Sequence, residues 1–182
     1  MLLDQIRNDP DLAYALAAST ADFDVSRTYE FVEAVHLASG AALERVAGDG
    51  AGGAFFLVGD GGEERPVLYA DSEGSSGLIG WNLRAVVEMV VMLPYWHDLF
   101  GRKVDSLPDL RTLAAEVAVQ YAEIFEDSPD LEVQRQVAIS KLGLPWSDDP
   151  LANLYAAVKS TSPDYVLFNS DENTAYAPLL GA

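Results

Sequence analysis

The sequence predicts an α+β domain: a twisted antiparallel sheet with helices packed on it and a helical C-terminal extension. Two observations support this class. Short β-branched and aromatic runs, separated by turn residues, follow one another between residues 42 and 80. Most of the remaining chain repeats apolar residues at helical spacing. The 182 residues are 49% hydrophobic, which suffices for a buried core, so we expect one domain over residues 1–182.

The expected domain has three parts. Residues 1–41 hold N-terminal helices, residues 42–99 hold the sheet and its core helix, and residues 100–182 form the helical extension with a short terminal hairpin. The helices of the first part are predicted at three places: residues 1–7, 11–18 and 28–39. The third prediction rests on helical spacing of apolar residues, among them Phe31, Val32, Val35 and Leu37.

An antiparallel meander of three or four strands is predicted in the second part. The candidate strands are residues 42–46, 55–58, 67–69 and 78–79. Glycines and Asp60 between the second and third strands are typical of a hairpin connection. Asn82 is the expected N-cap of a strongly apolar helix that ends before Pro94. Because that helix is so apolar, we expect it to be buried against the sheet.

The third part is mainly helical by its pattern of caps and apolar residues. Ser106 to Asp109 resembles a capping box, and Ser128-Pro129 and Asp149-Pro150 are typical of two further helix starts. Gly143 and Pro145 are expected to end the middle helix. Two strand-like runs follow, at residues 165–168 and 175–179, and predict the terminal hairpin.

The charge of the chain restricts its partners. It has 11 Lys and Arg against 29 Asp and Glu, a net charge of −18. Such a chain repels nucleic acid and anionic membranes, so neither is expected as a partner. It attracts a basic protein and speeds the encounter with it. High solubility is the alternative explanation of the same acids, and the sequence does not separate the two.

Composition also excludes several chemistries and indicates a compartment. With no cysteine, the chain forms no disulfide, thiolate nucleophile or Cys-ligated zinc site. The first residues do not resemble a signal peptide, and the apolar helix before Pro94 is too short to span a bilayer. We therefore expect a cytoplasmic protein.

No catalytic, cofactor or metal site is predicted. Residues 48–53 formally match G-x-G-x-x-G, but a strand pattern follows where a dinucleotide site requires a helix. His36 and His97 are the only histidines, and no G-x-S-x-G motif supplies an activated serine. The three tryptophans each border a predicted helix and are expected in the core: Trp81, Trp96 and Trp146.

Five acids on two loops are the candidate partner-binding residues. They are Asp60, Glu63, Glu64, Asp71 and Glu73. Paired carboxylates also bind hard cations, but neither group has the alternating spacing of a calcium loop. We expect these acids to form a contact surface for a basic partner, with a solvated rim as the alternative.

An ordered set of short motifs in the central part resembles one known family. The set comprises Gly52 to Phe56, Arg65 to Tyr69, Glu73-Gly74, Ile79 to Leu83 and Leu93 to Leu99. It resembles the SUKH superfamily, the bacterial SMI/KNR-like domains, over roughly residues 42–99. The motifs consist mainly of glycines and apolar residues that serve the fold, so they are low in specificity.

The resemblance implies an immunity role without enzymatic activity. Many members are similar to proteins that neutralise a polymorphic toxin, and the acidic loops would then cover the Lys and Arg of a basic toxin such as a nuclease. Two alternatives stay open. One is a regulatory protein-interaction module of the cell-wall-linked branch, which binds through an apolar patch. The other is a small-molecule binder with a cleft near Trp96 and His97.

Overall fold

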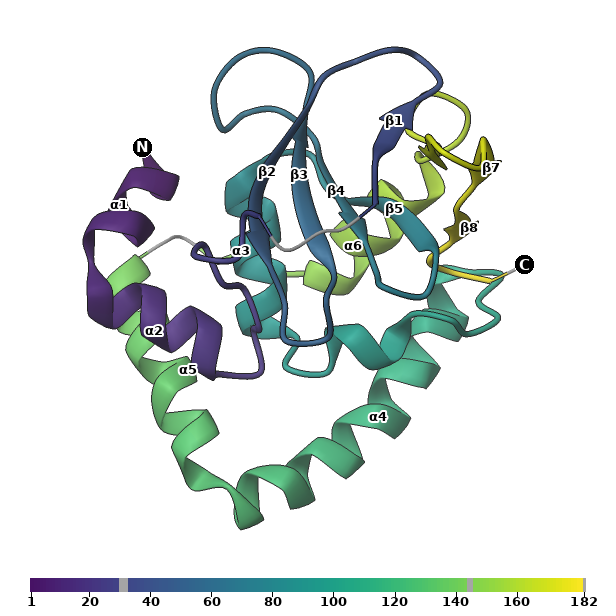
Figure 1. The fold of residues 1–182 in the computed structure, drawn as a ribbon. Helices are drawn as coiled ribbons and strands as arrows, with labels where there is room; N and C mark the ends of the chain where they lie inside the picture. Colours follow the sequence, from purple (N-terminus) through teal and green to yellow (C-terminus); the bar gives the residue numbers. More distant parts are fainter. Residues whose placement is uncertain (30–32, 144–145, 182) are drawn as a thin grey trace.

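The computed structural model describes residues 1–29, 33–143 and 146–181, and Figure 1 shows its ribbon. Within these residues it has a five-stranded main sheet, a three-stranded second sheet and six α-helices. The predicted α+β class is confirmed. No helix within the same ranges combines the length and the apolar character needed to cross a membrane.

The main sheet is an antiparallel meander with one added strand from the end of the chain. Its strands are β2 (Leu43–Gly48), β3 (Ala54–Val58), β4 (Val67–Ala70), β5 (Ser75–Gly80) and β8 (Ala177–Pro178). The first four neighbour one another in chain order and pair antiparallel, which confirms the predicted meander. Strand β8 pairs parallel with β5, an addition that the sequence analysis did not anticipate.

The second sheet joins segments from the two ends of the chain. It consists of β1 (Val35–Leu37), β6 (Leu167–Asn169) and β7 (Thr174–Ala175), with β6 in the middle and both pairings antiparallel. Strands β6 and β7 form a terminal hairpin, but the second predicted strand, residues 175–179, is divided between β7 and strand β8 of the main sheet. The yellow C-terminal segment therefore lies beside β1 in Figure 1, although more than half of the chain separates them.

The predicted helix over residues 28–39 is wrong in its described part. Val35–Leu37 is strand β1, in which the middle side chain is exposed and the last is buried. Pairing with β6 supplies backbone hydrogen bonds that compete with the helix, and the alternating burial favours the strand. Phe31 and Val32, which also supported the helix, lie outside the described residues.

Both faces of the main sheet are buried, because the side chains of β3 alternate between two apolar clusters. Phe55 and Leu57 belong to the larger cluster, which the helices build. Phe56 belongs to the second cluster, together with Leu37 of β1 and Leu167 of β6. The second sheet thus covers the face that most of the helices leave open. This explains why every residue of β3 and β4 is buried.

Two helices precede the sheet and one follows it, and the one that follows begins at the predicted cap, Asn82. They are α1 (Leu2–Asn8), α2 (Pro10–Ala18) and α3 (Leu83–Met92). Asp9 caps α2, and Asn82 caps α3, each by accepting hydrogen bonds from backbone N–H groups of the first turn. Seven of the ten residues of α3 are buried, as expected for a helix packed under the sheet.

A short aromatic turn precedes the helical extension, which contains three more helices. The turn is the 3-10 helix η1 (Trp96–Leu99), and the helices are α4 (Leu107–Asp127), α5 (Pro129–Leu142) and α6 (Pro150–Lys159). Ser106 accepts a hydrogen bond from the N–H of Asp109, and Asp149 accepts one from Ala152, so both predicted caps are confirmed.

Helices α4 and α5 form a hairpin that projects from the body of the domain (Figure 1). The buried residues of α4 all lie in its first half, and those of α5 lie in its second half. The turn at Ser128 is therefore exposed. Gly143 follows α5 with a left-handed φ of 53°, the conformation expected of a glycine at a helix end. Pro145 lies outside the described residues.

The tryptophans differ in burial, contrary to the prediction that all three belong to the core. Trp96 is fully buried, and its indole N–H donates to the carbonyl of Ala21 at 3.1 Å. Trp146 is partly buried against the larger cluster. Trp81 is 47% exposed and contacts Tyr165 edge-on. Trp81 lies beyond the last residue of β5, whereas Ile79, two positions earlier, is buried within the strand.

Replacing Trp96 with Phe should destabilise the fold far more than the same change at Trp81. Trp96→Phe removes buried ring volume and leaves the carbonyl of Ala21 without its donor, so we expect a loss of about 2–3 kcal/mol in the free energy of unfolding. Trp81→Phe should cost about 0.5 kcal/mol or less because the side chain is half exposed. Urea unfolding of both variants tests this, and equal losses would contradict the assigned core.

Candidate functional site

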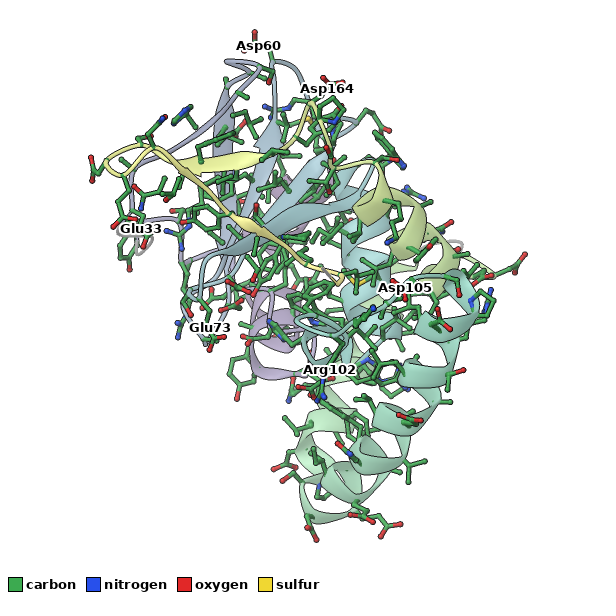
Figure 2. The ribbon with its side chains drawn as sticks, turned by 90° about the vertical axis from the view of Figure 1, so that its right-hand side faces the viewer. Glu33, Asp60, Glu73, Arg102, Asp105 and Asp164 are labelled. Atoms are coloured by element: carbon green, nitrogen blue, oxygen red, sulfur yellow. The ribbon has the colours of Figure 1, made fainter. Side chains whose placement is uncertain are left out.

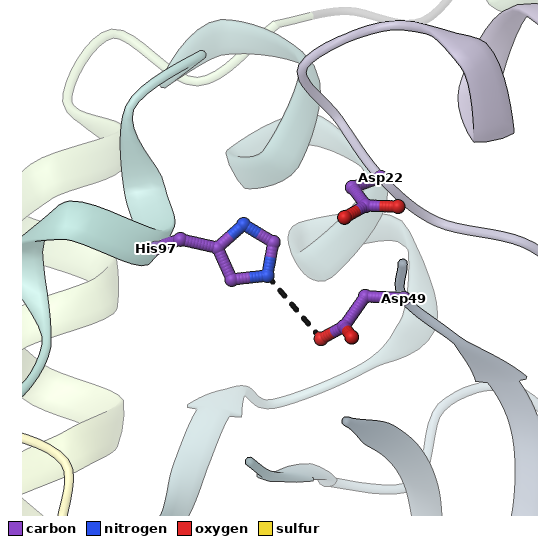
Figure 3. Close-up of side chains that lie close together, drawn as sticks. All are labelled: Asp22, Asp49 and His97. Atoms are coloured by element: carbon purple, nitrogen blue, oxygen red, sulfur yellow. Dashed lines mark hydrogen bonds and ion pairs between the residues drawn. The ribbon is translucent and has the colours of Figure 1, made fainter. Parts of the chain in front are cut away.

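Three ionisable side chains meet beside the glycine-rich turn between β2 and β3: Asp22, Asp49 and His97 (Figure 3). One nitrogen or carboxylate oxygen of each lies within 4.8 Å of the others. Asp22 comes from the loop after α2, Asp49 from the end of β2, and His97 from η1. The fold therefore joins three segments that are far apart in the sequence.

The carboxylate of Asp49 is the buried centre of this cluster. Its Oδ1 accepts hydrogen bonds from the backbone N–H of Ala51 at 2.9 Å and of Gly53 at 2.7 Å. Its Oδ2 accepts from the hydroxyl of Tyr69 at 2.6 Å and lies 3.3 Å from Nε2 of His97. The side chain has no solvent-exposed surface. The turn, strand β4 and η1 are thus held to one carboxylate.

These contacts decide the ionisation states of Asp49 and Tyr69. Burial favours the neutral acid, but the hydrogen bonds from His97, Tyr69 and Gly53 outweigh it and lower the pKa of Asp49 to about 2. Burial raises the pKa of Tyr69, and the negative charge of Asp49 raises it further. At neutral pH the pair is therefore an ionised carboxylate that accepts from a neutral phenol.

Gly53 makes the close approach possible. A Cβ at this position would lie 2.3 Å from Oδ2 of Asp49 and 2.6 Å from the hydroxyl of Tyr69. Both distances are shorter than any tolerated contact, and neither neighbour can withdraw without giving up its hydrogen bond. The glycine that suggested a phosphate-binding loop is thus required by a buried carboxylate.

Asp22 and His97 form the outer part of the cluster. The Oδ1 of Asp22 accepts from the N–H of Gly50 at 2.9 Å, and its backbone has a left-handed φ of 46°. Partial burial raises the pKa of Asp22, against the lowering effect of the Gly50 hydrogen bond and of His97. The ring of His97 stacks on Trp96 with 3.5 Å between ring centroids and is partly exposed.

The arrangement is best suited to holding the fold together. A carboxylate accepts about four hydrogen bonds, and Asp49 already has four polar contacts of this kind. Carboxylate and imidazole are also ligands for divalent cations. A cation here, however, would have to take His97 away from Asp49. We interpret the cluster as a structural clamp.

The predicted partner-binding acids lie in two places and not on one surface. Asp60, Glu63 and Glu64 belong to the connection between β3 and β4, whereas Asp71 and Glu73 belong to the turn between β4 and β5. Successive connections of an antiparallel meander lie at opposite ends of the sheet. Figure 2 shows Asp60 and Glu73 far apart accordingly.

Two of these acids hold backbone groups. Glu63 accepts from the N–H of Leu2 at 2.7 Å and of Leu3 at 2.6 Å, which fixes the start of α1 against the sheet. Asp71 accepts from the N–H groups of Glu73 and Ser75 and thereby closes the β4–β5 turn.

The other three predicted acids are exposed. They are Asp60, Glu64 and Glu73. Glu64 accepts a hydrogen bond from the side chain of Asn82 at 3.2 Å. Of the five predicted acids, these three can therefore contact a partner without breaking a hydrogen bond to a backbone N–H group.

The Asp22–Asp49–His97 cluster was not anticipated from the sequence. Asp49 and His97 are 48 residues apart, and no motif of fixed spacing connects them. The available signal was the acid inside the glycine-rich stretch, which fits a loop folded around a carboxylate as well as it fits a phosphate loop.

Comparison of the chain with protein-family models, with curated proteins and with solved structures finds no match. The resemblance to the SUKH superfamily therefore stays a prediction.

Replacing Asp49 with Asn should destabilise the protein by on the order of 2–3 kcal/mol. The variant retains the shape of the side chain but loses the charge, and its amide N–H₂ faces Tyr69 and His97, which are arranged to meet an acceptor. Asp60→Asn at the exposed loop is the matched control and should change the free energy of unfolding by less than about 0.5 kcal/mol. Urea unfolding at neutral pH measures both.

The contribution of Asp49 should disappear in acid. Its folded pKa of about 2 lies below that of an unfolded aspartate, about 3.9. The stabilisation is therefore complete above about pH 4 and is lost as the pH falls towards about 2. We expect the difference in unfolding free energy between the wild type and Asp49→Asn to shrink over this interval. A difference that stays constant with pH would contradict the assignment.

Proposed function

We propose that this chain is a non-enzymatic binding protein for a basic protein, and that the partner is a toxin which it neutralises. The observation that carries the proposal is the net charge of −18. A chain with this charge attracts a basic surface over a distance and speeds the encounter. A nuclease toxin is a suitable partner because its own basic surface is built to hold phosphates.

The fold pairs most of the basic side chains with acids of the same chain and leaves the net charge unchanged. At least six of the eleven basic side chains form ion pairs with acids of the same chain. The six are Arg27, Arg65, Lys103, Arg111, Arg135 and Lys141. The field that a partner meets therefore comes mainly from acids without a counter-charge.

The absence of enzymatic activity is part of the proposal. Asp49 is occupied by its own loop and by Tyr69, and Nε2 of His97 is turned towards it. General acid–base catalysis needs a group free to reach a substrate, and the hydrogen bonds of this cluster are directed inwards. We place the action in the cytoplasm, where the immunity proteins of such toxins would act.

A regulatory interaction module is the second candidate, and exposed apolar side chains favour it. Val119 is 66% exposed and Val133 54% exposed, both on the α4–α5 hairpin. A partner that binds chiefly through such residues would be retained at high salt. Salt dependence therefore separates the two candidates.

The test is to identify a partner and measure how salt affects its binding. The protein is immobilised and exposed to lysate of the source cells at about 50 mM and about 300 mM salt, and the partner retained is then purified. The proposal expects a basic protein whose dissociation constant rises at least about tenfold between the two salt concentrations, and whose toxicity is suppressed by co-expression. An acidic partner or salt-independent binding would contradict it.

The three exposed loop acids provide the first variant. In Asp60→Asn/Glu64→Gln/Glu73→Gln the net charge falls from −18 to −15, while Glu63 and Asp71 keep their backbone hydrogen bonds. If these loops contact the partner, binding should weaken at least about fivefold at low salt. A variant with unchanged affinity would remove the loops from the interface and direct attention to the other acids.

A further inference from the structure

An open apolar groove runs along α5 from the projecting end of the α4–α5 hairpin. The groove has a volume of about 890 Å³, enough for several side chains of a bound segment. Phe125 contributes from α4, and Val133 and Val137 contribute from α5. All residues that line it come from the last turn of α4 and from α5, so the main sheet has no part in it.

The middle of the same hairpin, between Arg111 and Arg135, carries acids and no base. Residues 112–134 contain no Lys or Arg and six acids, a local charge of −6. The six acids are Glu116, Glu123, Glu126, Asp127, Asp130 and Glu132. Of these six acids, only Glu132 forms an ion pair within the described part of the chain, with Arg135 at 2.7 Å. Lys141, which also lines the groove, is held by Asp9 at 2.9 Å and by Asp11 at 3.2 Å.

Charge limits what can cover this groove. A second copy of the chain would bring the same six acids of residues 112–134 against this hairpin, and the like charges repel. Nucleic acid and anionic membranes are disfavoured for the same reason. A segment that carries Lys and Arg beside an apolar stripe satisfies both features, because its stripe covers the valines and its cations meet the acidic rim.

We infer that the α4–α5 groove is the docking surface for the basic partner, and that it takes an amphipathic helix with Lys or Arg flanking an apolar stripe. This inference rests on the proposed function and names its contact surface. The groove follows helix α5 and is closed at one end by the last turn of α4, and an amphipathic helix laid into such a groove buries the apolar floor along its length. The acids around the floor then select basic helices over neutral ones.

A defined peptide tests the groove without knowledge of the natural partner. The probe is a peptide of Leu and Lys, arranged as an amphipathic helix. Its length is about 14 residues, which corresponds to about four helical turns. A scrambled peptide of the same composition is the control. Binding of each to the full chain is measured by calorimetry at low salt, and backbone NMR shifts show where the peptide lies.

Two charge variants with the same net charge locate the binding site. Glu126→Lys/Asp127→Lys changes a residue that lines the groove and its neighbour at the end of α4, and Asp164→Lys/Asp171→Lys changes two exposed acids outside the hairpin by the same amount. We expect the first to weaken peptide binding at least about tenfold and the second less than about threefold. Val133→Asn, at an exposed position, should weaken binding about fivefold without loss of fold. Circular dichroism and thermal unfolding check that all variants are folded.

The outcomes separate this inference from the function on which it rests. Equal weakening by the two charge variants, or equal binding of the scrambled peptide, would contradict the groove as the docking surface. The proposed function of an acidic binding protein would still stand. Salt-independent binding, or equal binding of a Leu/Glu peptide, would overturn the requirement for a basic helix. If the peptide binds in the groove but no basic partner is recovered from the lysate, the proposed function is wrong. The inference that the groove binds a basic amphipathic helix then still holds.

Discussion

The buried carboxylate of Asp49 sets conditions that several distant segments must meet. A buried charge is tolerated only where hydrogen bonds replace its hydration. Asp49 receives N–H donors from its own turn and the hydroxyl of Tyr69, and it faces His97. The turn, β4 and η1 consequently have fixed relative positions, and Gly53 has to be a glycine.

Burial on both faces of the main sheet is the second condition, and it limits which surfaces are free. One face is under the helices and the other is under β1 and β6. A partner therefore has access to the ends of the sheet and to the helical extension. The projecting α4–α5 hairpin is the part of this extension that combines exposed apolar residues with unpaired acids.

The acids of this chain consequently serve different purposes, which net charge does not distinguish. Asp49, Glu63 and Asp71 hold backbone groups, and replacing them would disturb the fold. Acids such as Glu126 and Asp127 have no such partner among the described residues and are available to a basic surface. In this protein, acids that make no hydrogen bond to the fold are therefore better candidates for the contact surface than acids that are merely close in sequence.

The sequence by itself determined the local elements: the meander, the apolar helix α3 and the caps Asn82, Ser106 and Asp149. Each depends on residues within a few positions of one another, through hydrogen bonds of a first turn or through the spacing of apolar side chains. It also determined the overall charge, and with it the class of partner that we propose.

Only the tertiary structure decided which distant segments meet. The pairing of β1 with β6 replaced a predicted helix, and β8 joined the main sheet from the end of the chain. The cluster around Asp49 formed in the same way. In each case the contact joins residues tens of positions apart, and its free energy depends on how the whole chain packs, which no local pattern contains.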